Sequence, residues 1–308
     1  MYSISVLKNT PCTSALVYEA IKELCEKYRF IGCECIGKSV MNTDIWALTI
    51  GRGERKVFFN GAHHANEWIT APLLLKFIED YADAIENKKE ICQTDARRLF
   101  ARKKLCCVPL VNPDGVDLVN GAVSKTSLFY SDACHIAARH PHIPFPDGWK
   151  ANINGTDLNL NYPALWGEAR RIKSALGTDA PAPENYVGPM PLSEPESRAI
   201  YDYTLKNSFN MTLSYHTQGK VIYWKYFDFL PANSEEIALQ LSKASDYKLE
   251  ITPRESGHAG YKDWFISCYN KPGYTVEAGI GKNPLPLSQF DEMYSDNKPL
   301  LTLALDMA

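Results

Sequence analysis

The chain begins with helical periodicity and then changes to short apolar runs. Between residues 13 and 28 the apolar positions follow the helical period of about 3.6 residues, and Thr13 or Ser14 is placed to cap the N-terminus of this helix. Three apolar or alternating runs follow at residues 30–36, 45–50 and 57–60, and turn-forming residues separate them. This part of the sequence therefore predicts one helix followed by three β-strands.

The rest of the chain alternates between helical and strand-like patterns. Ser193 and Glu196 have the spacing of a capping box at the start of one of these helices. The interleaving predicts a single α/β domain over residues 1–308, with a mixed parallel and antiparallel twisted sheet covered by helices on both faces. We expect helices at 68–87, 193–207, 234–247 and from 287 to the end, and strands at 105–111, 211–215 and 273–277.

One long segment, residues 120–191, is rich in proline and is predicted to be loop-rich. Loops of this length inside a compact domain are usually functional. The segment contains Cys134-His135 and His140-Pro141-His142, which offer possible metal ligands. Their irregular spacing and the neighbouring prolines favour a surface loop over a second metal site.

Composition narrows the class of protein. Of the 308 residues, 45% are hydrophobic and 22% are charged, as in an ordinary globular protein. The formal net charge of -3 provides no broad basic surface, so nucleic acid is not expected as a partner. No apolar run reaches the roughly 18 residues that a membrane-spanning helix needs, so no membrane association is expected.

The N-terminus and the cysteines bear on the cellular compartment. Residues 1–30 contain no apolar segment typical of a signal peptide. The nine cysteines are an odd number, and Cys106 and Cys107 are adjacent within a predicted strand. Reduced thiols are the simplest state for such residues, and together these features predict a cytoplasmic protein.

Residues 32–39 match the phosphate-loop pattern G-x-x-x-x-G-K-S. A phosphate loop leads into a helix whose N-terminus faces the anion. Here residues 41–44 are turn-forming and 45–50 alternate like a strand, so the segment predicts a β-hairpin instead. Cys33 and Cys35 are accordingly interpreted as neighbours on one face of a strand and not as a metal-binding pair.

Candidate chemistry appears where predicted strands end. His64 and Glu67 follow the 57–60 strand, His216 follows the 211–215 strand, and Glu277 ends the 273–277 strand; Asn112-Pro113-Asp114-Gly115 follows the 105–111 strand in the same way. Loops at the carboxyl ends of strands line the ligand crevice of open α/β sheets. Two histidines and a glutamate could hold zinc with one position left open for water. Taken singly, H-x-x-E or a lone histidine is more often structural, whereas a carboxylate such as Glu277 is unlikely to be buried without a partner and is the best candidate for a general base.

Taken together, these residues resemble the carboxypeptidase A-like zinc metallopeptidases over nearly the whole chain. The resemblance implies that His64, Glu67 and His216 are ligands of one Zn²⁺ per chain and that Glu277 is the general base. It also implies that Asp157 orients His64 through the other ring nitrogen. The motifs that carry the resemblance are His64-Ala65-Asn66-Glu67-Trp68, Asn112-Pro113-Asp114-Gly115, Gly155-Thr156-Asp157-Leu158-Asn159, Tyr186-Val187-Gly188, Ser193-Glu194-Pro195-Glu196, Ser214-Tyr215-His216 and Glu277.

Several positions depart from that family pattern. Leu160 stands where typical carboxypeptidases have an arginine that clamps the terminal carboxylate of the substrate. Lys150 replaces the arginine that stabilises the oxyanion, and Gln218 replaces a tyrosine two places after the second zinc histidine. The mobile tyrosine of the family falls near Glu255. Removal of an ordinary C-terminal amino acid is therefore not the expected reaction.

These departures resemble the branch of the family that cleaves γ-D-glutamyl-meso-diaminopimelate bonds. The segments that carry this resemblance are residues 149–152, 159–164, 215–219 and 256–265. It implies a metallopeptidase acting on murein peptides, with Lys150 as a catalytic group and Asn159 and Gln218 as substrate-binding residues. Members of this branch often carry wall-binding repeats and an export signal, and neither is expected here.

Basic residues near the expected cleft are candidates for the extra carboxylates of a diaminopimelate peptide. They are Lys262, Arg254 and His258, and the alternative for them is a solvated loop. Three other functions stay open. They are a conventional metallocarboxypeptidase, a non-catalytic protein that binds wall peptides, and an amidase or esterase acting on small N-acyl amino acids.

Overall fold

A mixed eight-stranded sheet forms the centre of the molecule in the computed structural model, which describes residues 9–308. Residues 1–8, which begin the N-terminal segment in which no signal peptide is predicted, lie outside the described residues. The strand order is β1-β2-β6-β3-β7-β10-β8-β9. The strands are β1 (Gly32–Lys38), β2 (Asp44–Ile50), β3 (Arg55–Gly61), β6 (Lys103–Val108), β7 (Met211–His216), β8 (Val221–Tyr223), β9 (Lys248–Glu250) and β10 (Gly273–Glu277). A separate two-stranded sheet pairs β4 (Glu90–Ile91) with β5 (Thr94–Asp95).

The four central strands β6, β3, β7 and β10 run parallel, and antiparallel strands flank them. Their carboxyl ends therefore lie along one edge of the sheet. In the β7–β10 pair, His216 is the register partner of Glu277. The sheet thus brings two of the expected site residues together through backbone pairing alone.

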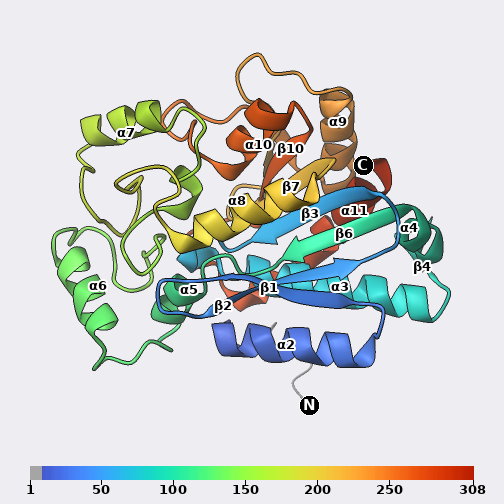
Figure 1. Cartoon of the computed structure of the whole chain (residues 1–308), viewed down its shortest axis with the longest axis horizontal. Coiled ribbons are helices and arrows are strands. Elements are labelled where there is room, and N and C mark those ends of the chain that lie inside the picture. The colour runs from blue at the N-terminus through green and yellow to red at the C-terminus, as the bar shows by residue number, and fades with distance from the viewer. Residues whose placement is uncertain (1–8) are drawn as a thin grey trace.

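Helices cover both faces of the sheet (Figure 1). Residues of α2, α3, α9 and α11 contribute to one apolar cluster, and residues of α8 and α10 contribute to the other. The helices are α2 (Ser14–Lys27), α3 (Thr70–Glu86), α4 (Ala96–Arg102), α5 (Pro113–Val119), α6 (Leu128–Ala138), α7 (Trp166–Ala175), α8 (Pro195–Asn207), α9 (Ser234–Ser245), α10 (Tyr261–Tyr269) and α11 (Phe290–Met307). Three short 3₁₀ helices complete the described elements: η1 (Ala65–Glu67), η2 (Leu158–Leu160) and η3 (Leu287–Gln289).

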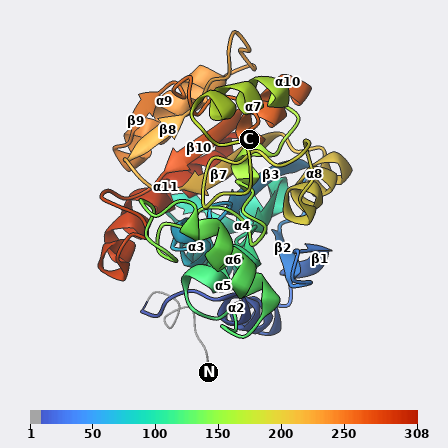
Figure 2. The ribbon, with the colours of Figure 1, turned by 90° about the vertical axis from the view of Figure 1, so that its left-hand side faces the viewer.

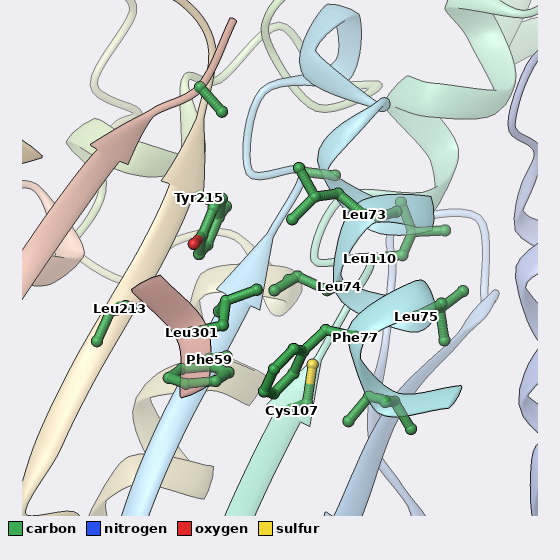
Figure 3. Packing of buried hydrophobic residues seen from close by; sticks show 14 of the residues in the cluster. Phe59, Leu73, Leu74, Leu75, Phe77, Cys107, Leu110, Leu213, Tyr215 and Leu301 are labelled. Atoms are coloured by element: carbon green, nitrogen blue, oxygen red, sulfur yellow. The ribbon is translucent and has the colours of Figure 1, made fainter. Parts of the chain in front are cut away.

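Alternation along the strands divides the core into two layers. On β3, Phe59 belongs to the cluster that includes α3 and α11, and Phe58 belongs to the cluster on the other face. Figure 3 shows Phe59 beside Phe77 of α3, with Leu301 of α11 close to them. The predicted α/β domain with helices on both faces is therefore confirmed, because strands buried on two sides need cover on both.

The N-terminal elements follow the sequence pattern closely. Thr13 caps α2 by accepting a hydrogen bond from Leu16 N, as predicted. Residues 32–39 form β1 and the start of its turn, and β1 pairs antiparallel with β2, so the phosphate-loop match is a β-hairpin. Cys33 and Cys35 are both exposed on β1, and Cys106 and Cys107 are buried free thiols in β6.

Two sequence predictions differ from the structure. The expected capping box fails because Ser193 Oγ donates to the side chain of Glu194, while the carboxylate of Glu196 is buried and accepts from Val40 N and Asn152 Nδ2. Residues 120–191 are loop-rich as expected, although they also contain α6 and α7. Cys134 and His135 lie in α6, not in a surface loop.

The segment with α6 and α7 forms a wall beside the sheet. Figure 1 shows these helices and the loops around them gathered at one side, and Figure 2, turned to face that side, shows them in front of the strands. Within residues 9–308, none of the helices combines the length and the apolarity needed to cross a membrane.

Candidate active site

Three buried side chains at the ends of β3 and β7 point their polar atoms at one another. His64 follows β3, Glu67 lies in η1, and His216 is the last residue of β7. His64 Nδ1 lies 2.9 Å from Glu67 Oε1, and His216 Nδ1 lies 2.9 Å from Glu67 Oε2. The two Nδ1 atoms are 3.2 Å apart. Within residues 9–308, this is the one cluster of three potential metal ligands whose ligand atoms all lie within 4.8 Å of one another.

The donor set and its spacing fit zinc. A tetrahedral zinc site with bonds of about 2.0–2.1 Å places neighbouring ligand atoms roughly 3.3 Å apart. The observed separations of 2.9 to 3.2 Å are close to that value. Two imidazoles and one carboxylate are also a ligand set of catalytic zinc, in which a fourth position stays open.

Asp157 holds His64 in the orientation that this site needs. Asp157 Oδ1 lies 3.1 Å from His64 Nε2, on the opposite side of the ring from Glu67. Backbone N–H groups of Asn159 and Asn185 donate to the same carboxylate. Burial disfavours the charged carboxylate, but His64 and Lys150 outweigh this effect, and the pKa of Asp157 is lowered. An ionised Asp157 fixes which ring nitrogen of His64 faces the ligand cluster.

The charges of the cluster stabilise one another. Burial opposes ionisation of Glu67, but the positive charges of His64 and Lys150 hold the pKa of its carboxyl well below the usual range. Burial also disfavours a charged His64, but Glu67 outweighs that effect and raises the pKa of His64 to about 9. In the absence of a metal ion, protonated His64 therefore balances the charge of Glu67, as a bound metal cation would.

Glu277 lies across the β7–β10 pair from His216 and lines the same cavity. Tyr274 and Val276 point into the core, so Thr275 and Glu277 point to the opposite face, where both line the cavity. Burial and the neighbouring charge of Glu67 raise the pKa of Glu277 to about 8. A carboxyl group that titrates near neutral pH is suited to accept and return a proton.

Lys150 brings a positive charge to the other side of the cluster. Its Nζ lies 3.5 Å from Glu67 Oε1, and its backbone oxygen accepts a hydrogen bond from Ala65 N. Burial disfavours the ammonium, but Glu67 and Asp157 outweigh it and the pKa of Lys150 is raised. Lys150 therefore stays charged within reach of the ligand cluster.

A cavity that is open to solvent lies over these groups. Of the residues predicted from the sequence, His64, His216, Glu277, Lys150, Asp157, Asn159 and Lys262 line it. Lys262 is buried; its Nζ lies 2.5 Å from Asp263 Oδ1 and donates to the backbone oxygen of Lys225. Asn159 uses its Oδ1 to accept from Tyr261 N.

The other predicted substrate-binding residues lie elsewhere. Gln218 is exposed and its Oε1 accepts a hydrogen bond from Gly281 N, away from the cavity lining. Arg254 and His258 line a second hollow, whose lining shares Thr252 with the first cavity. There His258 is buried, with its Nδ1 3.2 Å from the hydroxyl of Tyr226.

The sequence analysis did not single out several cavity residues. Lys173 comes from α7 and Asn185 from the loop that follows it, so both belong to the segment expected to be loop. Tyr223 comes from β8 and Thr275 from β10. The one available signal was the length of segment 120–191, which pointed to function without naming a residue.

Comparison with known proteins defines the class. The family described as zinc carboxypeptidase matches residues 17–299, so the chain belongs to that family of zinc metallopeptidases. The chain is 39% identical to gamma-D-glutamyl-L-diamino acid endopeptidase 1 of Lysinibacillus sphaericus, over 92% of this chain and 69% of that protein. It is 25% identical to mast cell carboxypeptidase A of Rattus norvegicus, over 68% of this chain and 47% of that protein.

Solved structures agree on the fold. Bovine thrombin-activatable fibrinolysis inhibitor, in complex with tick carboxypeptidase inhibitor, superposes with a TM-score of 0.74 at 19% identity, covering 98% of both chains. Murein-tripeptide amidase MpaA from Escherichia coli O157 gives a TM-score of 0.54 at 21% identity, covering 88% of this chain and 91% of that chain. The family resemblance and the fold expected from the sequence are therefore confirmed.

Proposed function

We propose that this protein hydrolyses the γ-D-glutamyl-meso-diaminopimelate amide bond of murein peptides, with one zinc ion held by His64, Glu67 and His216. The observation that carries the proposal is the convergence of these three ligand atoms within 4.8 Å at the base of a cavity that Glu277 and Lys150 also line. Identity of 39% to an endopeptidase named for the γ-D-glutamyl-diamino acid bond supports the substrate class.

Each chain residue has a distinct task in this reaction. Zinc, when bound, supplies a Lewis acid and lowers the pKa of water in its open position. Glu277 accepts a proton from the attacking water and then donates it to the leaving amine. Lys150 places its ammonium near the ligand cluster, where negative charge develops on the carbonyl oxygen of the scissile amide. Asp157 keeps His64 in position throughout.

The lining of the cavity supports a substrate other than an ordinary C-terminal residue. Leu160 lines the cavity with an apolar side chain, so no guanidinium stands there to clamp a terminal carboxylate. Three lysines, Lys150, Lys173 and Lys262, line the cavity instead. Amino groups spread around the wall suit a peptide whose carboxylates are also spread along its length.

The test compares three substrates on the purified protein, with and without a chelator. They are L-Ala-γ-D-Glu-meso-diaminopimelate, an ordinary α-linked peptide and an N-acyl amino acid. We expect the first to be cleaved at the γ-D-glutamyl amide, with cleavage lost on chelation and restored by zinc. Preferred cleavage of the α-linked peptide would identify a conventional carboxypeptidase, and preferred cleavage of the N-acyl amino acid a small-molecule amidase. Binding of the murein peptide without any cleavage would identify a non-catalytic binder.

A further inference from the structure

Helix α7 carries a lysine into the cavity that none of the steps above uses. Lys173 lines the cavity and is 6% exposed. In the described part of the chain, its Nζ donates to one acceptor, Asn185 Oδ1, at 2.7 Å. An ammonium group has three donors, and a neutral amide oxygen satisfies one of them without balancing the charge.

The other two lysines of the cavity differ in this respect. Lys262 has the carboxylate of Asp263 at 2.5 Å, and Lys150 has that of Glu67 at 3.5 Å. Within residues 9–308, no carboxylate oxygen lies within ion-pair distance of Lys173. Burial lowers the pKa of Lys173, and the carboxylates of Asp157, Glu184 and Glu255, none of them within ion-pair distance, offset this effect only in part.

The position of Lys173 is fixed by its helix and its partner. One turn earlier on α7, Ala169 packs with Leu160 and Val187 in a small apolar cluster, which holds this face of the helix toward the cavity. Asn185 is held in turn, because its backbone N–H donates to Asp157 Oδ2. The ammonium of Lys173 therefore faces the cavity as part of a built wall.

Among the negative groups that act on Lys173, Asp157 has the largest effect, and it already has partners. Asp157 accepts from His64 and from two backbone N–H groups, so its charge is compensated within the protein. An anion entering beside Lys173 would thus complete the coordination of that ammonium without displacing an existing ion pair. Carboxylate is the anionic group that a peptide substrate supplies.

We propose that Lys173, held by Asn185, binds a carboxylate of the substrate peptide that is not part of the scissile bond, and so determines specificity for an acidic peptide. This inference rests on the proposed peptidase function, because it assumes that a peptide occupies this cavity. Lys173 is a substrate-binding residue in this scheme and takes no part in proton transfer.

The test combines substitution of Lys173 with removal of each substrate carboxylate and asks whether their effects on KM are additive. L-Ala-γ-D-Glu-meso-diaminopimelate has one free carboxylate on D-Glu and two on diaminopimelate, and each is converted to the amide in turn. For the wild-type protein, one of the three amides should raise KM about 10- to 100-fold with little change in kcat, as expected for loss of a charge-assisted hydrogen bond. In Lys173→Met the parent peptide should show the same rise in KM, and that amide should cost nothing further.

Two further variants separate binding from structure. Lys173→Arg restores a cation and should recover most of the affinity. Lys271→Met is the matched control, because Lys271 Nζ also donates to a single neutral oxygen, that of Phe209, and does not line the cavity. It should respond to all three amides as the wild type does. If Lys173→Met also responds to every amide as the wild type does, the inference is wrong.

The same comparison made with dissociation constants in place of KM does not depend on turnover. Dissociation constants of the peptide and its amides are measured by calorimetry on zinc-loaded Glu277→Gln protein. Cleavage of the murein peptide without coupling to Lys173 would overturn this inference and leave the proposed function standing. Coupling to Lys173 in binding, with no cleavage by the wild-type protein, would overturn the proposed function and leave this inference standing.

Discussion

The two sides of the cavity are built in different ways. We call four residues the strand-end floor: His64 follows β3, Glu67 lies in η1, and His216 and Glu277 end β7 and β10. Lys173 and Asn185, which we call the loop wall, come from α7 and from the loop that follows it, whereas Arg254 and His258 line the neighbouring second hollow. Backbone pairing of the central sheet fixes the floor, whereas side-chain packing of a long connection fixes the wall. The difference separates the metal ligands and the base, which strand ends position, from Lys173, which the long connection positions.

Replacing the base, Glu277, should give the largest effect, and this effect should be confined to the chemistry of the strand-end floor. We expect Glu277→Gln to lower kcat about 10²- to 10⁴-fold, because proton transfer is lost, while one zinc ion per chain remains bound. Turnover and metal content are measured on the same sample. Glu292→Gln is the control, since Glu292 is exposed and pairs with Lys220 outside the cavity. Near-normal turnover in Glu277→Gln would show that another group is the base.

Asp157 tests whether the floor depends on a neighbour outside the ligand set. Asp157→Asn should weaken zinc binding or activity about 10- to 100-fold, because the orienting charge on His64 is lost. Competition with a chromophoric chelator measures the affinity. Asp80→Asn removes a carboxylate that pairs with Lys76 and Lys298 far from the cavity, and it should leave zinc affinity unchanged. Equal effects of the two substitutions would contradict the orienting role.

The acidity of His64 predicts how zinc binding depends on pH. With a pKa of about 9, His64 is protonated in the metal-free protein below that pH and must release its proton to bind zinc. Apparent affinity should therefore fall about tenfold for each pH unit below 9, until other groups titrate. Calorimetry in buffers of different ionisation enthalpy counts the released proton. Zinc affinity that is flat between pH 6 and pH 9 would show that His64 is neutral before metal binds.

The smallest effect is expected at Arg254, which lies outside the loop wall. Arg254 is exposed beside the second hollow, and an exposed ion pair contributes at most about 1 kcal/mol. Arg254→Gln should therefore raise KM less than about fivefold, with kcat and zinc content unchanged. The effect should disappear at high salt, since exposed charges are screened. A large loss of kcat would contradict this expectation and would show that Arg254 takes part in the reaction together with the strand-end floor.

The floor could be predicted from the sequence because strand ends are visible in it. Apolar runs located β3, β7 and β10, and His64, His216 and Glu277 stood at their ends. The order of these motifs along the chain then indicated the family. The pairing of His216 with Glu277 follows from sheet order, which the residues do not encode locally.

The wall could not be predicted in the same way. Helix α7 is polar overall and its buried residues are Ala169 and Lys173, so few apolar positions mark the helix in the sequence. The buried state of Lys173 depends on contacts with Asn185 and the neighbouring loops. The predicted capping box is wrong for a related reason. The backbone N–H of Val40, which is distant in the sequence, donates to the carboxylate of Glu196, so that carboxylate does not cap its own helix. Contacts with residues distant in the sequence determine the burial of Lys173 and the hydrogen bonds of Glu196, and the local sequence does not reveal these contacts.

The pairing of β7 with β10 makes the length of a strand as important as its composition. His216 and Glu277 are held opposite each other by ladder hydrogen bonds, so changes in surrounding side chains leave their spacing intact. Deleting one residue within β10 would instead turn the carboxylate toward the face that α9 and α11 cover, because side chains alternate along a strand. Such a protein would retain its ligand cluster and lose its base. Substitutions can therefore diversify this enzyme's substrates over evolutionary time, whereas insertions and deletions in this strand would be eliminated.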